Sequence, residues 1–182
     1  MKLMIASDLH GSAYYCRALL ESFRREEADR LVLLGDLLYH GPRNPLPREY
    51  DTVAVTAMLN SLAERLLCVR GNCDSEVDQM VLQFPMLADY AQLSVDGADV
   101  YATHGHLQGP ENPPPLPQGT YLLCGHIHIP VRQDLGRCVY LNPGSLALPK
   151  EQTPHSYLTL EGGVFTWKDV ETGAAFQPLE TV

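Results

Sequence analysis

The stretch KLMIASDLHG, residues 2–11, joins a short apolar segment directly to polar residues. Lys2–Ser7 has an entirely apolar centre, which is typical of a short strand that is buried on both faces. The polar residues Asp8 and His10 follow at once, and Gly11 ends this exit loop. A buried strand that ends directly in a carboxylate and an imidazole predicts a site at the edge of a sheet.

A helical pattern follows this strand, and the combination then repeats. Ser12 to about Glu27 has its apolar residues at helical spacing. Next come a strand at Leu31–Leu34, a polar loop, a helix whose apolar face includes Val55 and Leu59, and a strand at Leu66–Val69. This βαβαβ order favours a largely parallel, buried sheet with right-handed crossovers.

The second half of the chain is richer in strands. Asp96-Gly97 is a good hairpin turn, and the segment 109–119 is rich in proline and reads as a surface loop. We expect one α/β domain, residues 1–182, in which two sheets pack together with helices outside. The strands expected in this half are Gln92–Val95, Val100–Thr103, Tyr121–Cys124, Val139–Leu141, Tyr157–Leu160 and Val164–Lys168.

Composition narrows the class of protein. The chain has 182 residues and a net charge of −9, from 13 basic and 22 acidic residues, and no cluster of Lys and Arg that long nucleic acid would require. It has no apolar stretch near the ~20 residues that cross a bilayer and no signal-peptide pattern at the N-terminus, so we expect a cytoplasmic protein. Its five cysteines form no CxxC pair, which argues against a disulfide framework.

Polar residues gather at the carboxyl ends of the expected strands. In α/β sheets, ligands bind in the crevice beyond these ends, so we expect the clusters to converge. The clusters are SDLH (Asp8, His10), GD (Asp36), GNCD (Asn72, Cys73, Asp74), THGH (His104, His106), GHIH (His126, His128) and NPGS (Asn142, Ser145).

These residue types suit catalytic metal ions. Imidazole, carboxylate and amide oxygen favour Mn, Fe, Zn or Co in an open geometry, whereas a structural zinc site would show four Cys or His in paired spacings. Taken alone, each residue has an ordinary explanation, such as a loop carboxylate or a satisfied core histidine. Together, seven candidate ligands exceed the need of one ion and fit a two-ion clamp for phosphate-ester hydrolysis. They are Asp8, His10, Asp36, Asn72, His104, His126 and His128.

The ordered motifs D-x-H, GD, GN-x-D, H and GH-x-H resemble those of the calcineurin-like metallophosphoesterase superfamily, in particular its small bacterial phosphodiesterases. The resemblance spans residues 8 to 145. It implies a four-layer α/β/β/α sandwich of two mixed sheets, with the metals at the strand ends between them. It also implies two divalent ions, with Mn²⁺ favoured and Zn²⁺, Fe²⁺, Co²⁺ or Ni²⁺ as alternatives.

The resemblance further implies which ligands hold each of the two ions. Asp8, His10, Asp36 and His128 would hold one ion, and Asp36, Asn72, His104 and His126 the other, with Asp36 as the bridge. The implied reaction is hydrolysis of a small phosphodiester by a hydroxide that the two ions activate.

Cys73 departs from the family pattern, because many members have histidine at its position. A thiol is a poorer cationic partner for a dianionic monoester than an imidazolium is, so Cys73 is expected to favour diesters. The alternative is that cysteine only fits beside the metals.

Other candidate roles rest on the same motifs. Asp74 is expected to orient a ligand histidine or to cap the helix that begins near Ser75. Arg43 would contact a phosphate oxygen or remain a solvated loop residue. Asn142 and Ser145 would line the pocket or only form its turn.

Two other functions compete with the phosphodiesterase. One is a phosphomonoesterase on the same site. The other is a binding scaffold of the retromer-subunit kind, which is disfavoured because such proteins tend to lose metal ligands and none is missing here. A homodimer or homotetramer remains open, because no interface pattern is visible.

Overall fold

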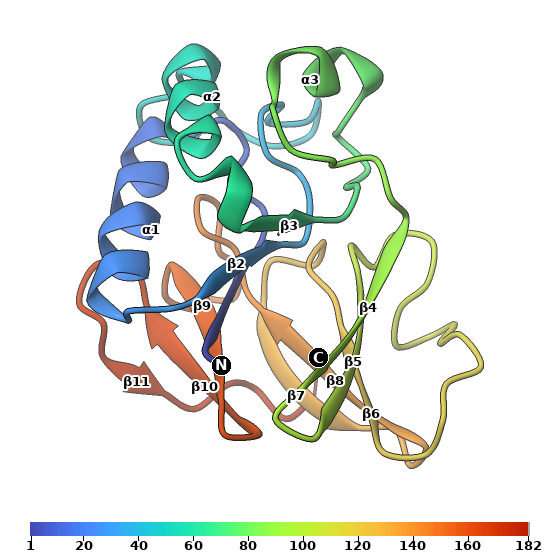
Figure 1. Cartoon of the computed structure of the whole chain (residues 1–182). Coiled ribbons are helices and arrows are strands. Elements are labelled where there is room, and N and C mark those ends of the chain that lie inside the picture. The colour runs from blue at the N-terminus through green and yellow to red at the C-terminus, as the bar shows by residue number, and fades with distance from the viewer. Residues whose placement is uncertain (182) are drawn as a thin grey trace.

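Two mixed β-sheets packed face to face form the centre of the computed structural model, which describes residues 1–181 (Figure 1). Val182, the last residue of the expected domain, lies outside the described residues. The six-stranded sheet has the order β11-β10-β9-β1-β2-β3, and the five-stranded sheet has the order β4-β5-β6-β8-β7.

In the first sheet, only the three strands from the N-terminal part of the chain are parallel. Strands β1 (Leu3–Ala6), β2 (Arg30–Leu33) and β3 (Leu66–Cys68) pair in parallel. The later strands β9 (Ser156–Glu161), β10 (Val164–Asp169) and β11 (Ala175–Phe176) extend the sheet antiparallel from β1.

The helices α1 (Ala13–Arg25), α2 (Thr52–Asn60) and α3 (Glu76–Val81) lie in the first half of the chain, with a short 3₁₀ turn at Ala63–Arg65. The Ser12 hydroxyl caps α1 by accepting from the Tyr15 N–H, and the Asp51 carboxylate caps α2 by accepting from the Ala54 N–H. In the described residues, none of the helices combines the length and apolar character needed to cross a membrane.

The second sheet contains β4 (Tyr90–Val95), β5 (Ala98–Thr103), β6 (Thr120–Leu123), β7 (Pro130–Asp134) and β8 (Cys138–Pro143). Strands β5, β6 and β8 are parallel, so their carboxyl ends share one edge. Strands β4 and β7 are the antiparallel edge strands.

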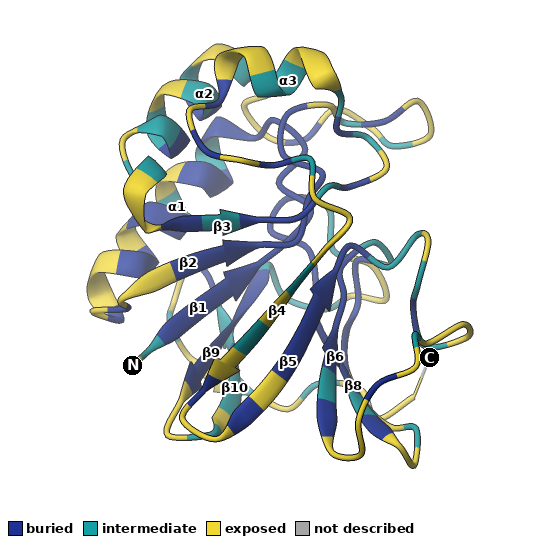
Figure 2. Ribbon diagram, turned by 45° about the vertical axis from the view of Figure 1, so that its right-hand side comes forward, coloured by how far each residue is buried: buried dark blue, intermediate teal, exposed yellow. Residues whose placement is uncertain are grey.

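The alternation of side chains explains why β1 is apolar throughout. Leu3 and Ile5 pack in the core between the sheets, together with residues such as Val100 and Leu141 of the second sheet. Met4 and Ala6 face the core beneath the helices. Figure 2 shows strand β1 in the colour of buried residues, and a strand covered on both faces is apolar on both of them.

The expected two-sheet α/β sandwich is confirmed, but its outer layer beside the second sheet is not helical. In the part of the chain that the structure describes, no helix follows Val81. Leu116, from the proline-rich segment 109–119, packs with Tyr101, Leu122 and Tyr140 on the outer face of this sheet. Five prolines in 109–119 lack the N–H donors that a helix needs, so a loop covers this face.

Candidate metal centre

The carboxyl ends of five strands bring the predicted ligands into one site. Asp8 and His10 follow β1, Asp36 follows β2, and Asn72 follows β3, all from the first sheet. His104 follows β5, and His126 and His128 follow β6, from the second sheet. The site therefore lies where the two sheets meet, and each sheet supplies part of it.

Three of the four candidate ligand histidines are held by backbone carbonyl groups. A carbonyl oxygen can only accept a hydrogen bond, so Nδ1 of each ring carries the proton and Nε2 of the neutral ring keeps a free lone pair. Fixing a ring in this way is typical of metal-binding histidines. The Nδ1 contacts are His10 with Tyr39 O (2.9 Å), His104 with Leu34 O (2.6 Å) and His128 with Leu148 O (2.8 Å).

The Nε2 atoms of these rings point at one another and at two carboxylates. The Nε2 atoms of His10 and His128 are 3.2 Å apart, and His128 Nε2 is 3.3 Å from Asp8 Oδ1. On the other side, His104 Nε2 lies 3.5 Å from Asp36 Oδ2 and 3.0 Å from Asn72 Oδ1. His10 Nε2 is 3.7 Å from both Asp8 Oδ1 and Asp36 Oδ2.

The donor set fits divalent cations. The potential ligand atoms of Asp8, His10 and His128 lie within 4.8 Å of one another, and so do those of Asp8, Asp36 and His104. Asp8 Oδ1 is buried and has no hydrogen-bond partner among the described residues, although a buried carboxylate oxygen normally has one. The Nε2 lone pairs of His10 and His128 face each other beside this anionic Asp8 oxygen. Positive charge between these three atoms would stabilise them.

His126 and Cys73 differ from this pattern. The His126 ring is half-buried, 5.1 Å from the His104 ring between centroids, and its backbone N–H donates to Asp8 Oδ2 at 3.0 Å. Cys73 lies close to the ligands, as its place in the GNCD cluster leads us to expect, because its Sγ forms a further group of possible ligands with His10 and Asp36, again within 4.8 Å.

The carboxylates and imidazoles shift one another's pKa values. Burial acts to raise the pKa of Asp8, but contact with His128 and the nearby charges of His104 and His10 hold it well below its usual range. Burial acts to lower the pKa of His104, but its contact with Asp36 and the charge of Asp8 raise it to about 9. The site thus favours ionised carboxylates beside positive charge.

The loops that carry the ligands adopt an uncommon backbone conformation. Asp8, His10, Asp36, His126 and His128 all have positive φ, between 49° and 71°. Asp and His enter this left-handed region more readily than most residues, and such backbone is frequent at functional sites.

Two glycines allow these loops to approach closely. A Cβ at Gly71 would lie 2.1 Å from Asp36 Oδ1, and one at Gly125 would lie 1.9 Å from Ser7 Oγ. Only glycine fits at either position.

Asp74 supports the site in a way that differs from the sequence-based expectation. Its carboxylate accepts hydrogen bonds from the backbone N–H groups of Asp36 (2.8 Å), Leu37 (2.9 Å) and Gly71 (2.7 Å). In residues 1–181 it has no hydrogen bond to a histidine, and Ser75 rather than Asp74 caps α3. Asp74 therefore ties the exit loop of β2 to that of β3, which the sequence does not reveal because the partners are backbone groups.

Asn142 and Ser145 form the turn beside the site and do not line its cavity. Both are fully buried. The Asn142 Nδ2 group donates to Gly125 O at 2.7 Å, and the Ser145 hydroxyl donates to Asp8 O at 2.9 Å. They hold the loops after β6 and β1 in place.

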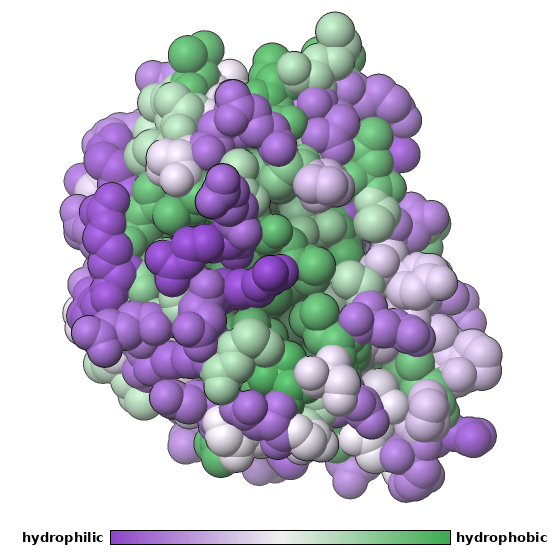
Figure 3. Space-filling view, in the orientation of Figure 1, coloured by the Kyte–Doolittle hydropathy of each residue, from purple (hydrophilic) through white to green (hydrophobic). Residues whose placement is uncertain are grey.

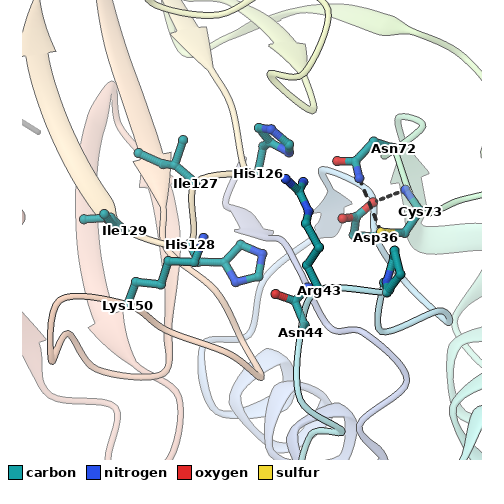
Figure 4. Close-up of a pocket in the computed structure, with 12 residues that line it drawn as sticks. Asp36, Arg43, Asn44, Asn72, Cys73, His126, Ile127, His128, Ile129 and Lys150 are labelled. Carbon is teal, nitrogen blue, oxygen red and sulfur yellow. Dashed lines mark hydrogen bonds between the residues drawn. The ribbon is translucent and has the colours of Figure 1, made fainter.

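A cavity of about 510 Å³ opens directly onto the metal-ligand candidates, within the size range of small-molecule sites. Figure 4 shows Asp36, Asn72 and Cys73 on one side and Ile127, Ile129 and Lys150 on the other. Arg43 and Asn44, from the loop after β2, also line it. The apolar wall and Lys150 were missed from the sequence, where the spacing of GHIHIP and a distant lysine gave no signal.

Comparison with known proteins adds the decisive observation. Residues 1–162 match the calcineurin-like phosphoesterase superfamily domain. The chain belongs to this superfamily. As a calcineurin-like phosphoesterase it is a metal-dependent enzyme, and the resemblance expected from its motifs is confirmed.

Individual members of the superfamily are similar over nearly the whole chain. Phosphodiesterase YfcE of Escherichia coli K12 is 48% identical over 166 residues, covering 91% of this chain and 90% of that protein. The solved structure of YfcE, a phosphoesterase from E. coli, matches with a TM-score of 0.94 and 44% identity over 98% of both chains.

Distant relatives share the fold. Wild-type Vps29 of Entamoeba histolytica, solved in complex with Zn²⁺, has a TM-score of 0.59 at 18% identity, covering 97% of this chain and 96% of that one. At this identity the match concerns the fold alone.

Proposed function

We propose that this calcineurin-like phosphoesterase hydrolyses small phosphodiesters at a pair of divalent ions, most favourably Mn²⁺. Asp8, His10, Asp36 and His128 would hold one ion. Asp36, Asn72, His104 and His126 would hold the other. The observation that carries the proposal is the pair of opposed Nε2 atoms in His10 and His128, 3.2 Å apart beside an unpartnered Asp8 oxygen.

The protein's own residues have separate tasks in this proposal. The carbonyl groups of Tyr39, Leu34 and Leu148 aim the imidazoles, and Asp74 fixes the two loops that carry Asp36 and Asn72. When bound, the ions would polarise the phosphate and supply hydroxide near neutral pH. Arg43 and Asn72, on the cavity wall, would bind the substrate's phosphate oxygens.

Cys73 supports a preference for diesters over monoesters. A cysteine side chain is a neutral thiol or an anionic thiolate, so it offers no positive charge to a dianionic phosphate. Burial, and then the charge of Asp36, raise the pKa of this thiol to about 12 and keep it neutral. A diester carries one negative charge less and needs no cation there. The name of the 48% identical relative, a phosphodiesterase, agrees with this preference.

The proposal is tested by turnover of chromogenic esters. The metal-depleted protein should hydrolyse bis-p-nitrophenyl phosphate faster than p-nitrophenyl phosphate once Mn²⁺ is added, and EDTA should stop both reactions. A higher kcat/KM for the monoester would favour the phosphomonoesterase instead. Failure of Mn²⁺ and each alternative ion to support turnover of either ester would overturn the proposal.

A single substitution tests the bridging ligand. Asp36→Asn keeps the acceptor for the Cys73 N–H, 2.8 Å away, but removes the charge that two ions would share. We expect at least a ~100-fold loss of kcat, because even partners beyond the ligands cost 10–100-fold. Activity within a few-fold of the wild type would remove Asp36 from the metal set.

A further inference from the structure

The cavity beside the metal centre has two walls of different chemistry. One wall carries Asp36, Asn72 and Cys73, which present a carboxylate, an amide and a thiol to the cavity (Figure 4). On the opposite wall, Ile127 and Ile129 lie together and Lys150 lies next to them. A phosphate group bound at the metal centre would leave this second wall for the rest of the substrate.

The two isoleucines are held firmly by the loop that carries the ligand histidines. They alternate with His126 and His128 along residues 126–129. Ile129 is 6% exposed, and Ile127 is half-buried, with its N–H donating to Gly125 O at 2.9 Å. A flat or apolar group esterified to a phosphate at the histidines would therefore share the cavity with this wall.

Hydrogen bonds hold the backbone of Lys150 in place, whereas its ammonium group has no partner among residues 1–181. Its N–H donates to His128 O at 3.1 Å, and its carbonyl accepts from the N–H and hydroxyl of Thr153. In residues 1–181 no ion pair or side-chain hydrogen bond uses its Nζ, unlike Lys2 and Lys168, which both contact Glu26. In a protein of net charge −9, a cation at this place attracts an anion into the cavity.

We propose that Lys150 determines substrate specificity by binding a second anionic group, a phosphate or carboxylate, on the alcohol portion of the diester. Ile127, the more exposed of the two isoleucines, would pack against the carbon skeleton between the two anionic groups, with Ile129 supporting it from behind. The substrate class is then a phosphodiester with an apolar or flat alcohol that bears its own negative charge. This inference rests on the proposed phosphodiesterase function and deepens it.

The test uses two diesters that release the same p-nitrophenolate. One is p-nitrophenyl phenyl phosphate, and the other is p-nitrophenyl 4-carboxyphenyl phosphate. With the Mn²⁺-loaded enzyme we expect the carboxylated ester to have the higher kcat/KM, by about fivefold, and mainly through KM, because a contact remote from the reacting bond binds ground and transition state alike. The preference should weaken as NaCl screens the charge.

Variants of Lys150 test whether its charge causes the preference for the carboxylated ester. Lys150→Met should abolish the preference, and Lys150→Glu should reverse it. Arg24→Met, which removes an exposed cation from the last turn of α1, should leave the ratio as in the wild type.

Two results would overturn the inference and leave the proposed function standing. One is turnover of both diesters without a preference, and the other is an unchanged preference in both Lys150 variants. Loss of function as a whole is distinguishable, because the metal-loaded wild type would then hydrolyse neither diester.

Discussion

The Nε2 atoms of His10 and His128 face each other at 3.2 Å, while the Nδ1 atoms of both rings are bonded to backbone carbonyl oxygens. The two residues are 118 positions apart and come from different sheets. Neither neutral ring can donate to the other through Nε2, so positive charge, either a proton on one ring or a bound metal ion, stabilises the pair. A divalent ion there would also join the two sheets.

Metal binding is therefore expected to stabilise the folded protein. With free Mn²⁺ at about 100 times its Kd, the gain is about 2.7 kcal/mol, which raises Tm by roughly 5–10 °C for a chain of this size. Calorimetry of the EDTA-treated protein, with and without Mn²⁺, measures the shift. The shift should shrink in His128→Ala, and an unchanged Tm in the wild type would contradict a metal at this pair.

The Asp74 carboxylate is expected to be a main support of the site. Asp74→Asn places an NH₂ group against backbone N–H donors that now have an oxygen acceptor, so we expect a loss of about 2–4 kcal/mol in the free energy of unfolding. Asp78→Asn is the matched control, because Asp78 only completes the capping box of α3 and should cost about 1 kcal/mol. Urea denaturation compares the two, and equal losses would refute the tie between the β2 and β3 loops.

A buried cluster of ion pairs around Glu26, away from the metal centre, is expected to make the free energy of unfolding depend on pH in the acid range. Burial acts to raise the pKa of Glu26, but the contacts with Lys168, Lys2 and Tyr157 lower it from 4.5 to about 2. Because the folded pKa is the lower one, the stabilisation is complete above pH 4.5 and is lost as the pH falls toward 2.

The variant Glu26→Gln should remove about 2 kcal/mol at pH 7, a value discounted for partial solvent screening, and should flatten the curve between pH 4.5 and 2. The exposed neighbour Glu27 serves as the control through Glu27→Gln, which should keep the wild-type slope. Urea midpoints across this range provide the measurement. The prediction fails if both variants follow the same curve.

Cys73 is expected to set the ratio of diesterase to monoesterase activity. Cys73→His should lower this ratio by roughly tenfold, because an imidazolium adds a charge-assisted hydrogen bond to a dianionic monoester. Cys73→Ser keeps the size and the neutral charge and should keep the ratio. If Cys73→His leaves the ratio unchanged, cysteine only fits there.

The position of Cys73 adds a second effect of the same substitution. A Cβ at Gly41 would lie 3.1 Å from Cys73 Sγ, so the loop that carries Arg43 rests on the thiol. The larger ring of histidine would push this loop outward. We therefore expect KM to rise for both ester types in Cys73→His and not in Cys73→Ser.

Much of the fold follows from local sequence signals. The apolar run in β1 and the Asp96-Gly97 turn between β4 and β5 led to correct strands, and Ser12, the first residue of the expected helix, is the N-cap of α1. Strands β7 and β11 were not predicted. Strand β7 begins with a proline and is mostly polar, and β11 has only two residues, so neither carries a run of alternating apolar residues.

The sequence predicts the side chains of the site, but not the contacts that hold these side chains in position. Asp8, Asp36 and His128 stood out because carboxylates and imidazoles at strand ends are chemically distinctive. The carbonyl groups that orient the histidines, the backbone partners of Asp74 and the place of Lys150 depend on contacts between distant segments. Backbone groups are the same at every residue, so such contacts leave no pattern in the sequence.

The left-handed backbone of Asp8, His10, Asp36, His126 and His128 has a consequence for anyone who transplants this centre to another scaffold. Copying seven side chains onto ordinary strand ends would aim them in the wrong directions, because the handedness of each turn sets the vector from Cα to ligand atom. Each such turn costs of the order of 1 kcal/mol, which the host must tolerate. A successful graft would have to import the loops together with the glycines that let them touch.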